Sequence, residues 1–170
     1  EEMQKEYDGY SYAVKKLLKE SERNSTLRSK MVGVLASLIH VPEKYETAIE
    51  IALGNAVQNI VTFDEQNAKD LINYLKHNEF GRATFLPITK LRPRSIDKDD
   101  VKALTFAGCF GLACDLITYN DNIKNVISNL LGSTIIVDNL ETAITISNKT
   151  KLSYKIVTLD GDVINPQGSL

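Results

Sequence analysis

One stretch of the sequence occurs twice, and this repeat limits what the chain can fold into. Residues 33–54, GVLASLIHVPEKYETAIEIALG, align without a gap with residues 111–132, GLACDLITYNDNIKNVISNLLG. The two copies share a glycine at each end, the dipeptide Leu-Ile near the start and Leu-Gly at the end. Two unrelated strand–helix units would also look alike in pattern, but the shared glycines favour duplication. A repeat this long predicts two related halves rather than a solenoid, which needs more and shorter repeats.

Each copy predicts a buried strand followed by a helix. The apolar runs at residues 34–39 and 112–117 have the length of a strand and are bounded by glycine and turn residues. In the first copy, Pro42 suits a first helical turn, where its missing N–H costs nothing. Apolar residues then recur on one helical face. These are Tyr45, Ala48, Ile49, Ala52, Leu53 and Ala56 in the first copy, and Ile123, Val126, Ile127, Leu130 and Leu131 in the second.

The resemblance between the halves continues beyond the repeat. Residues 60–63 and 134–137 predict strands, and Asp64 and Asp138 follow them as predicted helix N-caps. A final strand is predicted at 83–86 in one half and at 155–159 in the other. The chain is therefore predicted to be α/β (α+β-like), with two similar βαβαβ-type halves related by an approximate internal two-fold. The predicted apolar helix faces are Ala68, Leu71, Ile72 and Leu75 in the first half, and Leu140, Ala143 and Ile144 in the second.

The domain organisation follows from changes in composition. Residues 1–31 are dense in charge, and their few apolar residues, Val14, Leu17 and Leu18, predict a mostly solvated helix that ends a longer one. Residues 21–26 predict a loop. We expect residues 32–170 to form one domain, with a first half at 32–94 and a second at 95–170. Residues 87–100 would cross the surface between the halves, and Asp160-Gly161 predicts a hairpin turn.

The residues point to a binding or assembly module and not to an enzyme. The chain has 170 residues and a net charge of -2, so bulk charge does not indicate a nucleic-acid binder. Cys109 and Cys114 are interpreted as free buried thiols, and His40 and His77 as structural or exposed. No P-loop, dinucleotide fingerprint or nucleophile elbow is present in the sequence. We expect no catalytic residue, no cofactor and no metal site, and see no signal peptide or apolar stretch that could span a membrane.

Five segments resemble one known family when they are read together in this order. They are GYSYAVK (9–15), VPEKYETAIEIALG (41–54), GRATFLP (81–87), NLLGSTIIVD (129–138) and YKIVTLDGDVINPQGS (154–169). Together they cover nearly the whole chain and resemble the hinge domain of bacterial SMC (structural maintenance of chromosomes) proteins.

The resemblance implies a role in chromosome condensation and segregation. A hinge of this condensin-type family joins two coiled-coil arms by homodimerisation, and residues 1–31 then resemble the end of one arm. The ATP-binding heads would lie outside this chain, which is therefore expected not to be an enzyme. Kleisin and accessory subunits would bind only distant parts of the parent protein. The implied location is the bacterial cytoplasm, in association with the nucleoid.

The expected dimer interface lies at two open sheet edges, because unpaired backbone groups there can accept another strand. In the family, a glycine-rich dimerisation segment follows the last strand. Gly168 matches its start, whereas Gln167 stands where glycine is common. The candidate interface residues are Gly81, Arg82, Ala83, Thr84, Phe85, Gly161 and Gly168.

A weak, sequence-independent DNA contact is expected at the junction of arm and hinge, where positive charge gathers. Glu20 and Glu22 offset part of this charge, no aromatic ladder interleaves it, and a merely solvated charged helix is the competing interpretation. The candidate residues are Lys15, Lys16, Lys19, Arg23, Arg28 and Lys30. Without the resemblance, the alternative function is a small-molecule-binding α/β regulatory domain, although the sequence lacks a loop that cradles phosphate.

Overall fold

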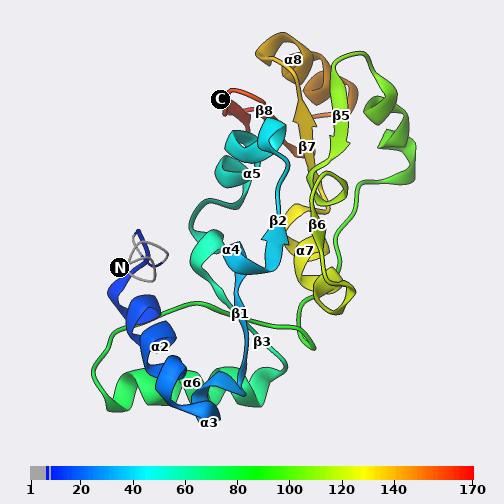
Figure 1. The fold of residues 1–170 in the computed structure, drawn as a ribbon. Coiled ribbons are helices and arrows are strands. Elements are labelled where there is room, and N and C mark those ends of the chain that lie inside the picture. The colour runs from blue at the N-terminus through cyan, green and yellow to red at the C-terminus, as the bar shows by residue number, and fades with distance from the viewer. Residues whose placement is uncertain (1–6, 8) are drawn as a thin grey trace. The chain divides into compact units, whose positions relative to one another are not determined.

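The computed structural model describes residues 7 and 9–170, which divide into two compact units, each with its own β-sheet (Figure 1). Unit 1 comprises the chain up to Leu38 together with Asn55–Leu91, and unit 2 comprises Ile39–Gly54 and Arg92–Leu170. The units therefore differ from the two halves of the sequence, because residues 39–54 of the first half pack in unit 2.

Unit 1 is a three-stranded sheet packed against two longer helices. Strand β3 lies between β1, which is antiparallel to it, and β4, which is parallel to it. The elements are α2 (Tyr12–Arg23), α3 (Ser25–Arg28), β1 (Met31–Val34), α4 (Leu35–Leu38), the 3-10 helix η2 (Gly54–Gln58), β3 (Ile60–Thr62), α6 (Glu65–His77) and β4 (Phe85–Pro87).

The core of unit 1 includes the N-terminal helix, which corrects the prediction of a mostly solvated one. Leu17 of α2 is fully buried and belongs to one apolar cluster with Ile60, Leu71 and Leu75. Burial of one such side chain contributes about 1.5–3 kcal/mol. The apolar stripe of α2 is wider than predicted, because Ala13 is buried beside the predicted Val14, Leu17 and Leu18. Residues 1–6 and 8 of the predicted arm end lie outside the described residues.

Residues 21–26 also differ from the predicted loop. Helix α2 continues to Arg23, and α3 starts at Ser25. Asn24 separates them, because its side-chain oxygen accepts hydrogen bonds from the backbone N–H groups of Thr26 and Leu27. The polar composition of this segment therefore marks a helix cap.

Unit 2 contains a four-stranded sheet and a two-stranded ribbon. The sheet order is β5-β7-β8-β9, with β7 and β8 parallel and both outer pairs antiparallel, and the ribbon pairs β2 with β6. The elements are β2 (Ile39–His40), η1 (Glu43–Tyr45), α5 (Glu46–Leu53), η3 (Lys98–Thr105), β5 (Cys109–Leu112), η4 (Ala113–Asp115), β6 (Thr118–Tyr119), η5 (Asp121–Ile123), α7 (Lys124–Leu131), β7 (Thr134–Val137), α8 (Leu140–Lys149), β8 (Lys155–Thr158) and β9 (Val163–Ile164).

The two sheets repeat one another in detail. In unit 1 the β1–β3 pairing has an irregularity between Met31 and Gly33, and in unit 2 the β5–β7 pairing has one between Cys109 and Gly111. These positions match in the sequence repeat. Each sheet then adds a parallel strand, reached through one helix. The structure thus gives the two copies corresponding strands and helices, as the duplication predicts.

The predicted apolar strands at 34–39 and 112–117 are each interrupted. A helical turn, α4, separates β1 from β2, and η4 separates β5 from β6. In the first copy, the Ser37 hydroxyl donates a hydrogen bond of 2.8 Å to the Val34 carbonyl and closes this turn. Apolar content alone could not distinguish a strand from a buried turn. The following helix also ends at Leu53, earlier than predicted, because Gly54 leaves the helical conformation with φ 55°.

One of the two predicted caps is confirmed and the other is shifted by one residue. Asp64 accepts a hydrogen bond of 2.8 Å from the Asn67 N–H and caps α6. Asn139, not Asp138, caps α8 by accepting from the Thr142 N–H at 2.9 Å. Asp138 instead accepts from the Asn139 N–H. The predicted α8 face is confirmed at Ala143, which is buried, but is wrong at Leu140 and Ile144, which are exposed. The other buried residues of this helix are Ile146 and Ser147.

The predicted hairpin near the end of the chain is confirmed. Strands β8 and β9 pair antiparallel around Asp160-Gly161, and Gly161 has a φ of 97° that favours glycine. None of the helices at residues 7 and 9–170 combines the length and the apolar character needed to cross a bilayer.

Candidate functional site

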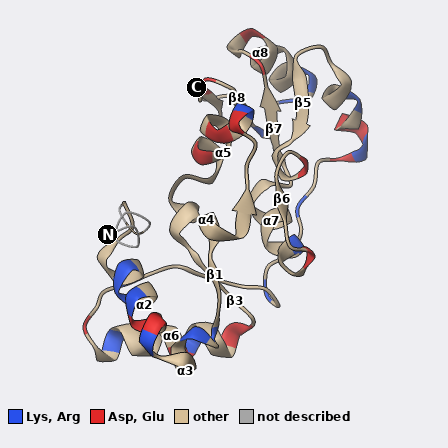
Figure 2. Ribbon diagram, viewed as in Figure 1, with Lys and Arg blue, Asp and Glu red and all other residues tan. Residues whose placement is uncertain are grey.

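Three basic residues of the predicted DNA-binding set form a row along the outer side of α2. Lys15, Lys19 and Arg23 are each four residues apart, so they follow one side of the helix while the buried residues occupy the other. Lys19 and Arg23 are exposed, and Lys15 is half-buried. Among the described residues, none of the three forms an ion pair. Figure 2 shows the basic segments of α2, and we call Lys15, Lys19 and Arg23 the basic row.

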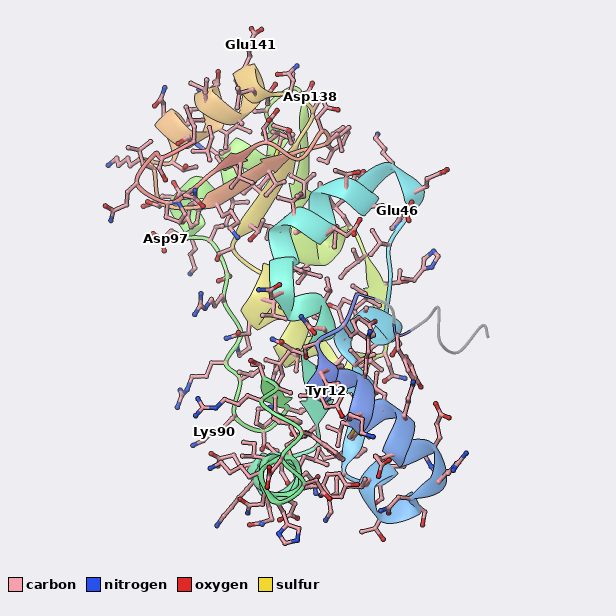
Figure 3. The ribbon with its side chains drawn as sticks, turned by 90° about the vertical axis from the view of Figure 1, so that its left-hand side faces the viewer. Tyr12, Glu46, Lys90, Asp97, Asp138 and Glu141 are labelled. Atoms are coloured by element: carbon pink, nitrogen blue, oxygen red, sulfur yellow. The ribbon has the colours of Figure 1, made fainter. Side chains whose placement is uncertain are left out.

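A fourth basic residue, Lys16, lies over an aromatic ring beside this row. Its ammonium nitrogen is 4.8 Å from the centre of the Phe80 ring, a geometry worth about 0.5–1 kcal/mol at an exposed site. Tyr12 lies at the start of α2 (Figure 3). Its ring packs edge-to-face on the Phe80 ring at 6.3 Å, and the residue is 63% exposed. An aromatic group therefore accompanies the charges. Sequence analysis missed it because Phe80 reaches α2 only through the fold.

The remaining two predicted DNA-binding residues are engaged within unit 1. Arg28 donates a hydrogen bond of 2.9 Å to the Ser21 carbonyl near the end of α2. Lys30 forms an ion pair of 3.0 Å with Asp70 of α6, whose other carboxylate oxygen accepts from Gln66. The hydrogen bond from Lys30, followed by that from Gln66, holds the pKa of Asp70 below its usual value. Arg28 and Lys30 thus join elements of unit 1.

Two acidic residues adjoin the basic row and are hydrogen-bonded. The Tyr74 hydroxyl donates to Glu20 at 2.9 Å, and the Tyr7 hydroxyl donates to Glu22 at 2.8 Å. Burial, and then the neighbouring Glu20, raise the pKa of Tyr74. The two acidic side chains offset part of the positive field on the flanks of the helix.

The first predicted interface segment, residues 81–85, leads into an open edge of the unit 1 sheet. Strand β4 pairs with β3 on one side, and its other side has no strand among the described residues. The Thr84 carbonyl accepts from the Ile60 N–H at 3.0 Å. The first three residues of the segment form no backbone hydrogen bond within the described part of the chain. Arg82 is exposed and forms no ion pair there. The segment thus offers unpaired backbone groups.

The second predicted segment, residues 161–168, includes β9, an edge strand of the unit 2 sheet. Gly161 lies against α5, because a Cβ there would be 3.3 Å from Thr47 and Ile51. Residues of α5 in the same protomer therefore occupy the space next to Gly161. Gly168 has a φ of 99° and lies next to Leu152, and both of its chain neighbours are exposed.

The thiols and imidazoles do not assemble into a reactive centre. Cys109 and Cys114 are free, as predicted, but half-buried. Burial, followed by the neighbouring Asp115, raises the pKa of Cys114 to about 11, so the thiol is protonated at neutral pH. His40 and His77 are exposed. Within residues 7 and 9–170, no three His, Cys, Asp or Glu side chains are grouped so that they could hold a metal ion.

Two hollows bear on the alternative function, and both are open to solvent. One in unit 2, of about 440 Å³, lies between η3 and the end of α8, where the Lys149 ammonium is 5.1 Å from the Phe106 ring. Another, in unit 1, of about 380 Å³, lies beside β1 and includes Gly33 and Leu18.

Comparison with known proteins assigns the family. The model of the SMC proteins Flexible Hinge Domain matches residues 28–147, which is more than half of the chain. The chain belongs to the SMC hinge family. This hinge is 43% identical, over its whole length, to the chromosome partition protein Smc of Bacillus subtilis and 34% identical, over 82% of its length, to that of Methanocaldococcus jannaschii. It spans only 14% and 12% of these two relatives.

Solved structures agree with this assignment. The hinge matches the SMC hinge domain of Geobacillus stearothermophilus, described as an asymmetric dimer, with a TM-score of 0.90 and 39% identity. The match covers 99% of this chain and 67% of that one. It also matches the Pyrococcus furiosus SMC hinge domain with a TM-score of 0.73 and 36% identity, over 99% of this chain and 82% of that one. The predicted hinge fold is thereby confirmed.

Proposed function

We propose that this hinge homodimerises and so joins two coiled-coil arms of a chromosome-partition SMC ATPase. The observation that carries the proposal is the start of the open segment, residues 81–83, whose backbone groups have no hydrogen-bond partner within the described residues. Unpaired edge groups favour the addition of a strand from another chain. The names of the relatives support the same role, since they are chromosome partition proteins and a related hinge is described as a dimer.

The proposed dimer is isologous and uses both units of each protomer. The segment 81–85 of one protomer pairs with the edge at residues 161–168 of its partner, and the two-fold axis repeats this contact. Arg82, which is exposed and without an ion pair in the described part of unit 1, would hold the contact from its rim.

Sedimentation velocity of the chain without any ligand tests this function. The expected result is a dimer, whereas a monomer that associates only with a small molecule would support the alternative, a ligand-binding regulatory domain. Gly168→Trp should shift the chain to the monomer by placing a large side chain at the proposed edge. Gly168→Asn is the matched control, because it also places a side chain at the positive φ of 99° but adds less bulk. If the Trp variant stays as dimeric as the wild type, Gly168 does not belong to the interface.

The proposal includes weak DNA binding at the basic row together with Lys16. Phosphate contacts need positive charge at suitable spacing and carry no base specificity. The overall charge of -2 means that any attraction must be local to α2. Binding should therefore be independent of sequence and should fall steeply as salt increases.

A triple change of Lys15, Lys16 and Lys19 to Glu tests the DNA contact. Fluorescence anisotropy at low salt should detect binding to the wild type and none to the variant, with the dimer intact in parallel sedimentation. Equal binding by both proteins, or no binding by the wild type, would remove this surface as a DNA site.

The wider role also belongs to the proposal. The ATP-binding heads and the sites for kleisin and accessory subunits would lie in other parts of a longer protein, which would act on the nucleoid in the bacterial cytoplasm. We therefore assign no enzymatic activity to the hinge itself.

A further inference from the structure

Helices α6 and α8 occupy corresponding places in the two units, yet α8 is apolar where α6 is charged. Each helix starts directly after its N-cap, so Leu140 corresponds to Glu65 and Ile144 to Lys69. Leu140 is 37% exposed and Ile144 is 43% exposed. Because α6 forms with charged residues at both positions, this fold does not require an apolar pair there. We call Leu140 and Ile144 the apolar pair.

The apolar pair lies on the flank of α8 next to the β9 edge. The opposite flank faces β5: the Thr142 hydroxyl lies 2.8 Å from where a Cβ of Gly108 would stand, and Lys149 lies over Phe106. With about 100° of rotation per residue, the apolar pair points away from those contacts. Since β5 and β9 are the two edges of this sheet, the pair is on the β9 side.

Unit 1 has a hollow on the corresponding flank of α6, next to the open segment 81–85. It encloses about 300 Å³. Ile72, Leu75 and Ala83 contribute apolar walls, and Lys76 and Arg82 contribute positive charge. Ile72 is itself 38% exposed, so the hollow presents apolar surface at the side of a sheet edge.

We infer that the apolar pair of one protomer enters the α6 hollow of its partner, alongside the paired edge strands. This inference rests on the proposed homodimer. Both strand–helix–strand crossovers are expected to be right-handed. Parallel pairing of β4 with the partner's β9 then places α6 and the partner's α8 on the same face, and antiparallel pairing places them on opposite faces. An apolar flank and an apolar hollow, each beside an open edge, select the parallel arrangement.

The distribution of charge also favours a second copy of the chain as the occupant of the α6 hollow. Glu141, next to the apolar pair in sequence, is exposed and points outward from α8 (Figure 3). Lys76 and Arg82 line the hollow, and none of these three residues forms an ion pair among the described residues. A second copy of the chain therefore presents an apolar pair with one negative charge to an apolar hollow with two positive charges.

Cysteine cross-linking between protomers tests this contact. In a background carrying Cys109→Ser and Cys114→Ser, Ile72→Cys is placed on one tagged chain and Ile144→Cys on a chain with a different tag. Circular dichroism checks that each variant folds. After mixing, a short bismaleimide should link the two tags in high yield. Thr145→Cys, turned toward the other flank of α8, is the matched control and should link to Ile72→Cys at least ten-fold less.

Sedimentation of the same mixture separates this inference from the proposed function. A dimer with the Ile72–Ile144 link supports both. A dimer in which this pair links no better than the control overturns the helix contact but leaves the dimer standing. A monomer at every concentration overturns both, and efficient linking of Ile144→Cys to itself contradicts the proposed arrangement.

Discussion

His40 and Thr118 pair with each other across the β2–β6 ribbon, and each occupies the other's place in the sequence repeat. The gapless alignment of residues 33–54 with 111–132 sets His40 opposite Thr118, and the antiparallel strands pair the same two residues in space. A local two-fold axis therefore passes between them. Within one chain, the ribbon has the isologous geometry that a symmetric dimer forms between two chains.

Gly132 is required for close packing against the segment that precedes η3. A Cβ at this position would overlap the Arg94 carbonyl oxygen, which also accepts a hydrogen bond from the Ser128 hydroxyl at 3.0 Å. Gly132→Ala should lower the free energy of unfolding by about 1–3 kcal/mol through overpacking. Ser128→Ala removes one hydrogen bond and adds no atom, so it should cost about 1 kcal/mol. Urea unfolding followed by circular dichroism compares them, and an unaffected Gly132→Ala would contradict this packing.

Leu17 tests whether α2 belongs to the folded core. Its side chain is fully buried in the cluster of unit 1, so Leu17→Ala should lower the free energy of unfolding by about 2–5 kcal/mol. Lys19→Ala, on the exposed side of the same helix, should change it by less than about 0.5 kcal/mol. Similar small effects from both variants in thermal and urea unfolding would indicate that α2 is not part of the core.

The spacing of apolar residues predicts the buried face of a helix only where the apolar residues are also the buried ones. The helix face at Ala48, Ile49, Ala52 and Leu53 was correctly predicted, because apolar spacing and burial coincide there. The buried face of α8 was not, because Leu140 and Ile144 continue an apolar spacing that burial does not follow.

Contacts between residues far apart in the sequence could not be predicted, because no local sequence pattern marks them. The packing of residues 39–54 in unit 2 depends on contacts far along the chain. For the DNA site, the sequence identified six basic residues. Only the fold shows that Lys30 is paired with Asp70 and that Lys16 lies over Phe80.

The engagement of Lys30 leads to a prediction about DNA binding. Lys19 has no partner among the described residues, so Lys19→Glu should weaken binding several-fold at low salt. Lys30→Ala should leave the affinity within about two-fold, because its charge is already paired. It should instead destabilise unit 1 slightly, because the ion pair with Asp70 is partly exposed. Fluorescence anisotropy and urea unfolding measure the two effects, and a larger loss of affinity for Lys30→Ala than for Lys19→Glu would reverse this assignment.

Cys114 should react slowly until the solution is strongly alkaline. Its pKa is raised from 9.0 to about 11, chiefly by burial and then by Asp115, so alkylation by iodoacetamide should keep accelerating to about pH 11. Asp115→Asn should lower this pKa and speed the reaction at pH 8. The raised pKa also means that the unfolded state binds fewer protons above pH 9.0, so stability should fall between about pH 9 and 11. Mass spectrometry of the modified peptide in a Cys109→Ser background follows the rate, and a plateau near pH 9 would exclude the shift.

Hydrogen exchange at two protein concentrations tests the central claim most directly, because it reports both association and the edges involved. Backbone amides that pair across a dimer should exchange more slowly when the dimer is populated. Mass spectrometry should show slower exchange at high than at low concentration for peptides covering residues 81–85 and 161–168, with α5 and α7 unchanged. Sedimentation of the same sample shows whether it passes from monomer to dimer over this concentration range. If it does, and exchange at both segments is the same at the two concentrations, the account is contradicted.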